Sequence, residues 1–414
     1  MSDNTYIRSY KYRIYPTESQ RELINTFVNL RRYVYNWGIA REEERYQEKK
    51  DGKTTHGFYS YYDLNRMFGK LRNSPDKEFL KKIPLSTARL ALRDVANAYL
   101  SHFSNVYQGS PKFKSKKRAP KMFKTRNDRF YIDGDRVRFE GLYCSPDHKS
   151  ENAVVETINL KFDTGFKRSD SIKYISPSIS IDNFDNYWVS FSIEEPIIEL
   201  NVPQSEPIGI DMGIRQTLVL STREVFNRPN DKIKKLNKKL KRQHRHYTRD
   251  VIHRSKEAKR TKTKYEEIPI SNRSQKRLNG IRKTYARITN IKTTWYHTII
   301  KQIVTRNPQT IVIENIRVRE LQQKRYTQDL KDALAHADFY TMRKMFEHKC
   351  NRYGVNLIIA PKEYPSSQIC SNCGFIKDSH KDHGKHTYVC PNCGMRLDRD
   401  INAALNLLSL AYGS

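Results

Sequence analysis

The chain has 414 residues, with 77 Lys and Arg against 45 Asp and Glu, which gives a formal net charge of +32. This length allows two or three domains with a substantial core, and an aromatic share of 11% excludes a disordered basic tail. Such an excess of one sign repels itself in a compact fold unless a polyanion neutralises it, so nucleic acid is the expected partner. No long apolar run or cationic amphipathic helix favours a membrane, and residues 1–6 lack a hydrophobic signal region, so we expect a cytoplasmic protein.

The first part of the chain predicts one strand followed by helices. Basic and apolar residues alternate from Tyr6 to Tyr15, which is typical of a half-buried strand. Thr17 and Gln20 then have the spacing of a capping box, so a helix should begin there. Apolar residues with helical spacing predict a second long helix over 85–107, with Ala88, Leu92, Val95, Tyr99, Phe103 and Val106 on one buried face.

A basic stretch follows this second helix. Its cations are interleaved with aromatic residues, which favours a groove that tracks a nucleic-acid backbone over a merely solvated face. The candidate nucleic-acid contacts are Lys112, Lys114, Lys116, Lys117, Arg118 and Lys121. Residues 130–200 then alternate in short runs separated by turn residues, which predicts strands of a small β-barrel. Residues 194–207 read as a linker.

The second half contains two apolar strands that each carry one acid. Asp211 lies in the run Ile208–Ile214, and Glu314 directly follows the run 309–313. An acid in such a strand is costly unless it is paired or coordinates a cation, although Asp211 could instead form a turn and Glu314 a salt bridge. Between them, residues 232–264 hold fifteen Lys or Arg against two acids, which predicts a long exposed helical region and favours phosphate binding over solubility alone.

The cysteines near the C-terminus form two Cys-x-x-Cys knuckles separated by sixteen residues. Their spacing predicts a four-cysteine zinc ribbon, rather than a disulfide framework or a redox pair. The glycine after each knuckle, Gly374 or Gly394, suits the left-handed backbone that these turns need. The predicted Zn²⁺ ligands are Cys370, Cys373, Cys390 and Cys393.

A third acid, Asp400, stands at the start of an Ala-rich helix directly after the ribbon. Alone, it would be interpreted as a helix N-cap. Together, Asp211, Glu314 and Asp400 can hold two Mg²⁺ ions for phosphodiester hydrolysis. The element order is a strand with Asp, a hairpin partner, helices, a strand with Glu, a helix, a strand, a metal lobe and a helix headed by Asp. This order predicts an RNase H-like α/β domain.

The chain resembles the TnpB family of transposon-encoded RNA-guided nucleases, which are relatives of compact type V CRISPR effectors. The resemblance spans nearly the whole chain and is most specific at its C-terminal end. The matching motifs are Tyr12–Thr17, Tyr35–Trp37, Pro111–Ser115, Gly209–Gly213, Ile313–Ile316, Ser366–Cys370 with the ribbon, and Asp398–Ala404.

The resemblance implies a multidomain α+β fold. It implies a wedge-type β-barrel over 1–16 and 111–200, with a helical recognition domain over 17–110 inserted into it. A RuvC nuclease domain would follow over 207–369 and 395–414, with the zinc ribbon over 370–394. By the family's motif, Asp211, Glu314 and Asp400 are the catalytic acids, and Asp398 is secondary.

The implied activity is Mg²⁺-dependent cleavage of double-stranded DNA by a single RuvC site with two ions. A guide RNA would select the target, and the protein would read a short motif beside it. We expect a monomer that works in the cytoplasm of a prokaryote, on nucleoid DNA. The alternatives are an RNA-guided regulator that does not cut, a guide-independent transposase or resolvase, and a zinc-ribbon RNA-binding protein without catalysis.

Overall fold

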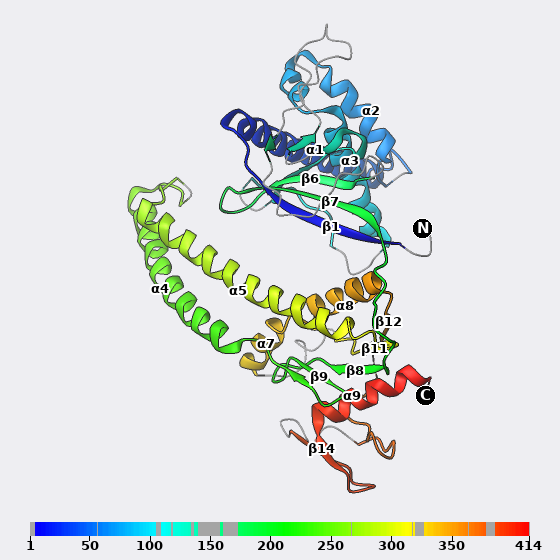
Figure 1. Ribbon diagram of the computed structural model, residues 1–414. Coiled ribbons are helices and arrows are strands. Elements are labelled where there is room, and N and C mark those ends of the chain that lie inside the picture. The colour runs from blue at the N-terminus through cyan, green and yellow to red at the C-terminus, as the bar shows by residue number, and fades with distance from the viewer. Residues whose placement is uncertain are drawn as a thin grey trace. The chain divides into compact units, whose positions relative to one another are not determined.

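The computed structural model of the chain describes residues 5–55, 57–104, 109–116, 119–133, 136–139, 158–159, 173–265, 267–316, 318, 327–362, 364–377 and 386–413 (Figure 1). The protein is an α+β protein with mixed sheets, as the sequence predicts. It divides into an N-terminal unit, Ile7–Glu195, and a C-terminal unit, Met1–Tyr6 with Pro196–Ser414. None of the helices within the described residues has the length and apolar character needed to cross a bilayer.

Two sheets of the N-terminal unit share one hydrophobic core. Phe123 and Phe191 of the first sheet pack with Phe130 and Phe139 of the second. The first sheet has the order β1-β7-β6-β2 and the second the order β3-β4-β5; closure into a barrel stays a prediction. The strands are β1 (Thr5–Ile14), β2 (Lys121–Lys124), β3 (Phe130–Asp133), β4 (Arg136–Phe139), β5 (Ile158–Asn159), β6 (Ile175–Ile181) and β7 (Tyr187–Pro196).

The helices of this unit begin where the sequence predicts. The first long helix starts after Thr17, whose hydroxyl accepts from the backbone of Gln20 while the Gln20 side chain accepts from Thr17 N, so the predicted capping box is confirmed. The second predicted helix is also present, but Phe103 is 55% exposed and does not belong to its buried face. The helices are α1 (Glu18–Lys50), α2 (Tyr61–Arg72), α3 (Leu85–Ser104) and the 3₁₀ segments Pro75–Lys82 and Asn127–Arg129.

A five-stranded mixed sheet lies at the centre of the C-terminal unit, in the order β10-β9-β8-β11-β12. The first three strands pair antiparallel, whereas β11 runs parallel to both β8 and β12. All four residues of β11 are buried, as expected for a central strand covered on both faces. The strands are β8 (Ile208–Asp211), β9 (Leu218–Leu220), β10 (Val225–Phe226), β11 (Thr310–Ile313) and β12 (Asn356–Ile359).

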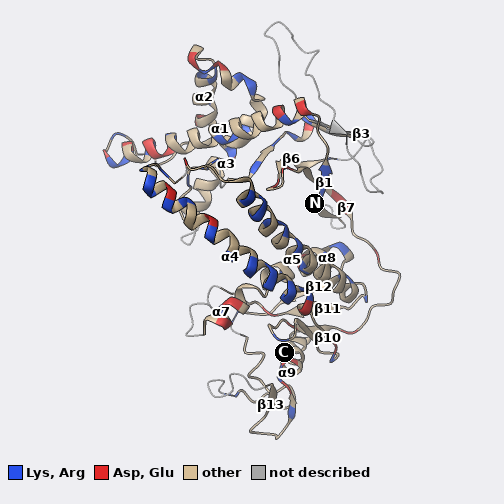
Figure 2. Ribbon diagram, turned by 90° about the vertical axis from the view of Figure 1, so that its left-hand side faces the viewer, with Lys and Arg blue, Asp and Glu red and all other residues tan. Residues whose placement is uncertain are grey.

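Two long helices of this unit, α4 and α5, form an antiparallel hairpin between β10 and β11. Lys and Arg follow both helices along their length, so the exposed basic helical region predicted over 232–264 is confirmed as a helix (Figure 2). The helices of the unit are α4 (Asn230–Thr261), α5 (Asn272–Val304), α7 (Gln328–Ala335), α8 (Phe339–Tyr353), α9 (Arg399–Ser409) and the 3₁₀ turn Leu410–Tyr412.

The second Cys-x-x-Cys knuckle connects the two strands of a small antiparallel ribbon, β13 (Thr387–Val389) with β14 (Arg396–Asp398), and the first knuckle precedes β13 in the chain. Gly374 has φ +74° and Gly394 φ +72°, so both adopt the predicted left-handed conformation. In each knuckle, the backbone N–H of this glycine donates to the carbonyl of the first cysteine. The ribbon leads directly into α9, which ends the described chain apart from the 3₁₀ turn.

Candidate active site and metal lobe

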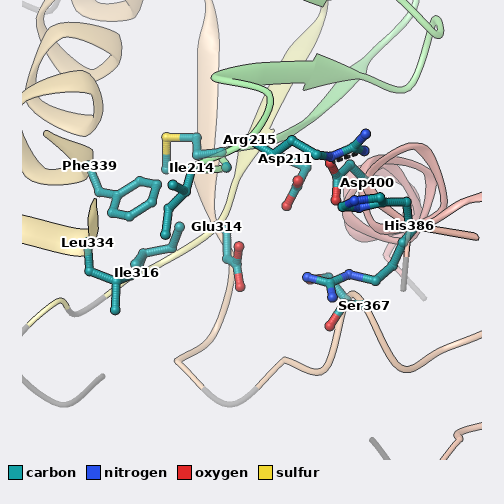
Figure 3. A pocket seen from close by; sticks show the side chains of 14 residues that line it. Asp211, Ile214, Arg215, Glu314, Ile316, Leu334, Phe339, Ser367, His386 and Asp400 are labelled. Atoms are coloured by element: carbon teal, nitrogen blue, oxygen red, sulfur yellow. Dashed lines mark hydrogen bonds and ion pairs between the residues drawn. The ribbon is translucent and has the colours of Figure 1, made fainter. Parts of the chain in front are cut away.

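The three acids predicted from the sequence line a single cavity of about 320 Å³ (Figure 3). Asp211 is the last residue of β8, and Glu314 directly follows β11. Because Ile210 and Ile313 are register partners in neighbouring parallel strands, their two successors leave the sheet at the same edge. Asp400 comes from the first turn of α9. The fold therefore brings together acids that lie up to 189 positions apart in the sequence.

Close packing of α9 on β8 brings Asp400 to this edge. Gly209 in β8 makes it possible, since a Cβ at this position would lie 2.1 Å from the Ala404 carbonyl oxygen and 2.5 Å from Leu408 N. Any larger residue would push the helix off the strand, and Asp400 would move with it. A glycine inside a strand weakens the strand itself, so its presence here serves the close approach.

The N-cap of α9 is Asp398 and not Asp400. Asp398 Oδ1 accepts from the backbone N–H of Asp400 at 2.9 Å and of Ile401 at 3.3 Å. The simple interpretation of Asp400 as a helix cap is therefore wrong, because the carboxylate of Asp398 already caps the helix. The Asp400 carboxylate is left to face the cavity.

Crowding and burial strongly perturb the acids at the sheet edge. Burial raises the pKa of Asp211 well above its ordinary value, and the nearby carboxylates of Glu314 and Asp400 raise it further. Burial also raises the pKa of Glu314, against which the guanidinium of Arg399 acts. Like charges held together in a partly dry site create a demand for cations.

Two arginines that the sequence analysis did not single out neutralise part of the negative charge of these acids. Arg215 Nη2 donates to Asp400 Oδ2 at 2.9 Å and to Asp398 Oδ2 at 3.1 Å. Arg399 lines the same cavity and lowers the pKa of both Asp211 and Glu314. The only sequence signal was their adjacency to the acidic motifs. The cavity is thus acidic with a partial internal counter-charge.

The four cysteines gather more tightly than the acids. Their sulfur atoms all lie within 4.8 Å of one another, and two of the Sγ–Sγ distances, Cys370–Cys393 and Cys373–Cys390, are 3.6 Å. A tetrahedral site with Zn–S bonds of about 2.3 Å needs sulfur atoms about 3.8 Å apart. Within the described part of the chain, this is the one group of His, Cys, Asp or Glu whose ligand atoms are already this close; the three carboxylates border their cavity with more space between them.

Each knuckle also supports the exposed cysteine of the other. Asn372 Nδ2 donates to Cys393 Sγ at 3.7 Å, and Asn392 Nδ2 donates to Cys373 Sγ at 3.6 Å. The backbone N–H of Met395 and the Asn372 amide lower the pKa of the Cys393 thiol to about 6. Donors aimed at sulfur favour the thiolate, which is the form that binds a metal ion.

Two buried asparagines fasten the metal lobe to α9. Asn402 Nδ2 donates to the Ile369 carbonyl at 2.7 Å, and Asn402 Oδ1 accepts from the backbone N–H of Ser371 at 3.0 Å. One helical turn on, Asn406 Nδ2 donates to the carbonyls of Ser366 and Ile369, each at 2.7 Å. The lobe therefore holds the helix that begins at the third acid, which explains the asparagine two residues after Asp400.

The predicted nucleic-acid contacts fall into three groups. Lys114, Lys116 and Lys121 line a second cavity, which belongs to the N-terminal unit, and Lys112 is exposed just before them. Lys117 and Arg118 lie outside the described residues. Sequence reasoning missed that α1 contributes two arginines, Arg31 and Arg32, to the same cavity.

Comparison with known proteins finds matches to two family models and to relatives that span nearly the whole chain. The Cas12f1-like TNB domain matches residues 339–407, which contain α8, the metal lobe and most of α9, and the helix-turn-helix domain of IS605 OrfB proteins matches residues 3–51. A protein named "Putative RNA-guided DNA endonuclease" from Streptomyces pristinaespiralis is 24% identical over 97% of this chain and 89% of its own length. The TnpB-like protein L770 of Acanthamoeba polyphaga mimivirus is 25% identical over 98% of this chain and 73% of its own length. The chain is therefore similar to TnpB-like proteins and RNA-guided endonucleases over nearly its whole length.

A solved structure shares the fold of this chain. The structure, a Cas12f1–sgRNA–target DNA complex, matches with a TM-score of 0.60 at 13% sequence identity and covers 98% of this chain and 99% of its own. At this identity the match concerns the fold. The residues that match the helix-turn-helix domain form, where described, strand β1 and the single long helix α1.

Proposed function

We propose that this chain is a TnpB-type RNA-guided DNA endonuclease that binds a guide RNA, reads a short motif beside the target and cuts double-stranded DNA. The relatives named as RNA-guided endonucleases support this proposal, as does the Cas12f1 fold relative, which was solved with sgRNA and target DNA. One observation carries it: Asp211, Glu314 and Asp400, from three distant segments, line one cavity, where burial and the two neighbouring carboxylates raise the pKa of Asp211. A binding-only protein has no need to hold three carboxylates together at this cost.

The donor set of the cavity fits Mg²⁺. Magnesium prefers hard oxygen ligands and takes few protein carboxylates together with water and substrate phosphate. The crowded acids offer carboxylate oxygens, and neutralisation by a cation would relieve the repulsion that raises the pKa of Asp211. When bound, two such ions would activate a water and stabilise the leaving oxygen of the phosphodiester.

The chain's own residues would bind and orient. Asp211 and Glu314 stand on a rigid sheet edge, whereas Asp400 stands on a helix that the buried asparagines Asn402 and Asn406 hold in place. Arg399, which already faces the two strand-end acids, would contact the negative charge of the scissile phosphate.

We assign the domains on the same basis. The five-stranded sheet with α8 and α9 would be the RuvC domain, over 207–369 and 395–414, and the four-cysteine lobe over 370–394 would bind structural Zn²⁺. The two sheets of the N-terminal unit would form the wedge over 1–16 and 111–200, with 17–110 as the recognition domain. Helix α1 contributes side chains to two cores, the one that the two sheets share and the one that it forms with α2 and α3. It would therefore connect the wedge to the recognition domain.

The test is DNA cleavage by the full chain purified with its RNA. The co-purified RNA is sequenced, and a duplex that matches the guide is offered with Mg²⁺ to the parent chain and to Asp211→Asn. We expect cutting by the parent only, and loss of cutting after RNase treatment. Asn keeps the size of Asp but removes the charge, so a folded and inactive variant would assign the defect to the carboxylate.

Two results would sink the proposal in different ways. Target binding by the parent chain without cutting would make it an RNA-guided regulator. Cutting that survives removal of the RNA would make it a guide-independent transposase or resolvase.

A further inference from the structure

The second cavity, in the N-terminal unit, has a volume of about 230 Å³ and an unusual lining. Five cations contribute to it: Arg31 and Arg32 from α1, Lys114 and Lys116 from the loop before β2, and Lys121 at the start of β2. No carboxylate is part of this lining. Pockets for apolar ligands are larger, at about 300–1,000 Å³, and mostly hydrophobic. The lining therefore points to an anion.

The cavity is built before any ligand arrives, because Lys114 is fixed at both its ends. Its backbone N–H donates to Asn36 Oδ1 at 2.8 Å, and its carbonyl accepts from Asn36 Nδ2 at 3.0 Å. Its ammonium lies 3.3 Å from the centre of the Tyr35 ring. A side chain fixed in this way loses little conformational entropy when it binds a ligand.

The charge of the cavity is only partly balanced. Asp94 on α3 pairs with Arg31 and, at 2.7 Å, with Lys124, so one acid serves two cations. Lys121 has an exposed partner, Asp185, at 3.4 Å. Across the described residues, neither Arg32 nor Lys116 makes an ion pair.

We propose that this cavity binds the phosphodiester backbone of a nucleic acid, with Arg32 and Lys116 as its free cations and Lys114 as its fixed one. The proposal rests on the proposed function for the identity of the polyanion, which is guide RNA or target DNA. Arginine offers a planar fork for phosphate oxygens and lysine a point charge. Bound phosphate would release counterions, so the contribution of the cavity has a defined salt dependence.

The test compares two double variants of the full chain, both in the Asp211→Asn background so that no probe is cut. Arg32→Gln/Lys116→Gln removes two charges from the cavity. The matched control, Lys49→Gln/Lys50→Gln, removes two exposed charges from the far end of the same helix, about 27 Å from Arg32. Thermal unfolding of all chains confirms that folding is unchanged.

Two binding arms separate the sources of phosphate. The first titrates RNA-free protein with a single-stranded RNA, and the second titrates guide-loaded protein with a DNA duplex, each between about 50 and 200 mM salt. We expect the slope of log K against log salt to fall by about 0.7 per lost contact with the RNA or about 0.9 with the duplex. The arm in which it falls identifies the source. Slopes equal to those of the control in both arms would overturn the proposal.

A second readout uses the fixed lysine. Burial, and after it the charge of Arg31, lowers the pKa of Lys114 to about 8; Lys124 adds to this shift and Asp94 acts against it. The Tyr35 ring faces the ammonium, and Arg32, Lys116 and Lys121 line the same cavity. A phosphate would raise this pKa, so binding should take up a proton and weaken above pH 8. Lys114→Gln should bind more weakly at pH 7 and lose the pH dependence. Binding by the parent that does not change between pH 7 and pH 9 would contradict the role of Lys114.

These outcomes are independent of catalysis. If the parent chain never cuts DNA but the salt slope falls in the cavity variant, the nuclease proposal fails and the phosphate site stands. If the parent chain cuts DNA and the salt slopes of the cavity variant match those of the control, the nuclease proposal stands and the phosphate site fails.

Discussion

Two of the cavities formed by the described residues, one in each unit, have linings of opposite charge. Three carboxylates line the first and five cations line the second. Each has a partial internal counter-charge, which is Arg215 with Arg399 in the acidic cavity and Asp94 beneath the basic one. In each cavity, some of the charge is therefore balanced by residues of the chain itself, and the rest is left without a counter-charge among the described residues. The unbalanced negative charge of the first cavity favours hard cations, and the unbalanced positive charge of the second favours phosphates.

The largest expected effect is on cleavage. Glu314→Gln removes one charge from the acidic cavity while keeping the shape of the side chain. We expect DNA cleavage to fall by at least about 10²–10³-fold, because a charge-stabilising group at the reacting centre is lost. RNA and DNA binding should persist, since the basic cavity is untouched. Single-turnover cleavage together with a binding titration measures both, and cleavage within a factor of ten of the parent would remove Glu314 from the mechanism.

The next effect is on the stability of the N-terminal unit. Asp94→Asn leaves Arg31, whose side chain is 8% exposed, without its carboxylate. We expect the free energy of unfolding to fall by about 3 kcal/mol, because an uncompensated buried charge remains. Asp185→Asn is the control, since the exposed Lys121–Asp185 pair should contribute less than about 1 kcal/mol. Urea unfolding measures both, and equal losses would show that the basic cavity does not depend on its counter-charge.

Arg215 tests the counter-charge of the acidic cavity. It shares Asp400 Oδ2 with any cation bound there. Arg215→Ala should therefore tighten Mn²⁺ binding by roughly 10-fold, a modest figure because the arginine is 40% exposed. Mn²⁺ titration followed by electron paramagnetic resonance reports affinity without any cleavage, and Arg215→Lys should fall between. Weaker binding in the Ala variant would mean that Arg215 supports the metal instead of opposing it.

The smallest effect concerns pH in a buffer without added Mg²⁺ and without a chelator, so that the four-cysteine lobe keeps its proposed Zn²⁺. The pKa of Asp211 is raised by burial and by its neighbours, and burial raises that of Glu314. The folded protein then holds these protons more tightly than the unfolded chain. The contribution of these two groups to stability is therefore greatest at low pH, and it falls as pH rises through their raised pKa values. Asp211→Asn should flatten this fall, and Mg²⁺ should reverse it at neutral pH. Urea midpoints over a pH series give the measurement, and parallel profiles would contradict the crowding.

The sequence predicted best what local pattern controls. Alternation gave the strand β1, the capping box gave the start of α1, and cysteine spacing gave the metal lobe. Asp211 and Glu314 were identifiable because an acid at the end of an apolar strand needs a reason. These features depend on residues that are close together in the chain.

The missed features depend on contacts between distant segments. Strand β2 escaped notice because, in Lys-Met-Phe-Lys, only Phe123 is buried, and its lysines suit the edge of a sheet. Phe103 fits the helical period, but the α3 face is no longer covered at that turn. Arg31 and Arg215 are ordinary arginines until the fold brings them to Asp94 and Asp400.

One peptide carbonyl has a practical consequence for protein engineering. Ile369 O accepts from both Asn402 and Asn406, so the metal lobe and α9 are held in register at a single point. A lobe transplanted from a relative must keep the chain length between this carbonyl and its first cysteine. One extra residue there would rotate the knuckle away from both amides and release the start of α9. We expect the proposed cleavage to fail in such a variant while the proposed binding of Zn²⁺, RNA and DNA persists.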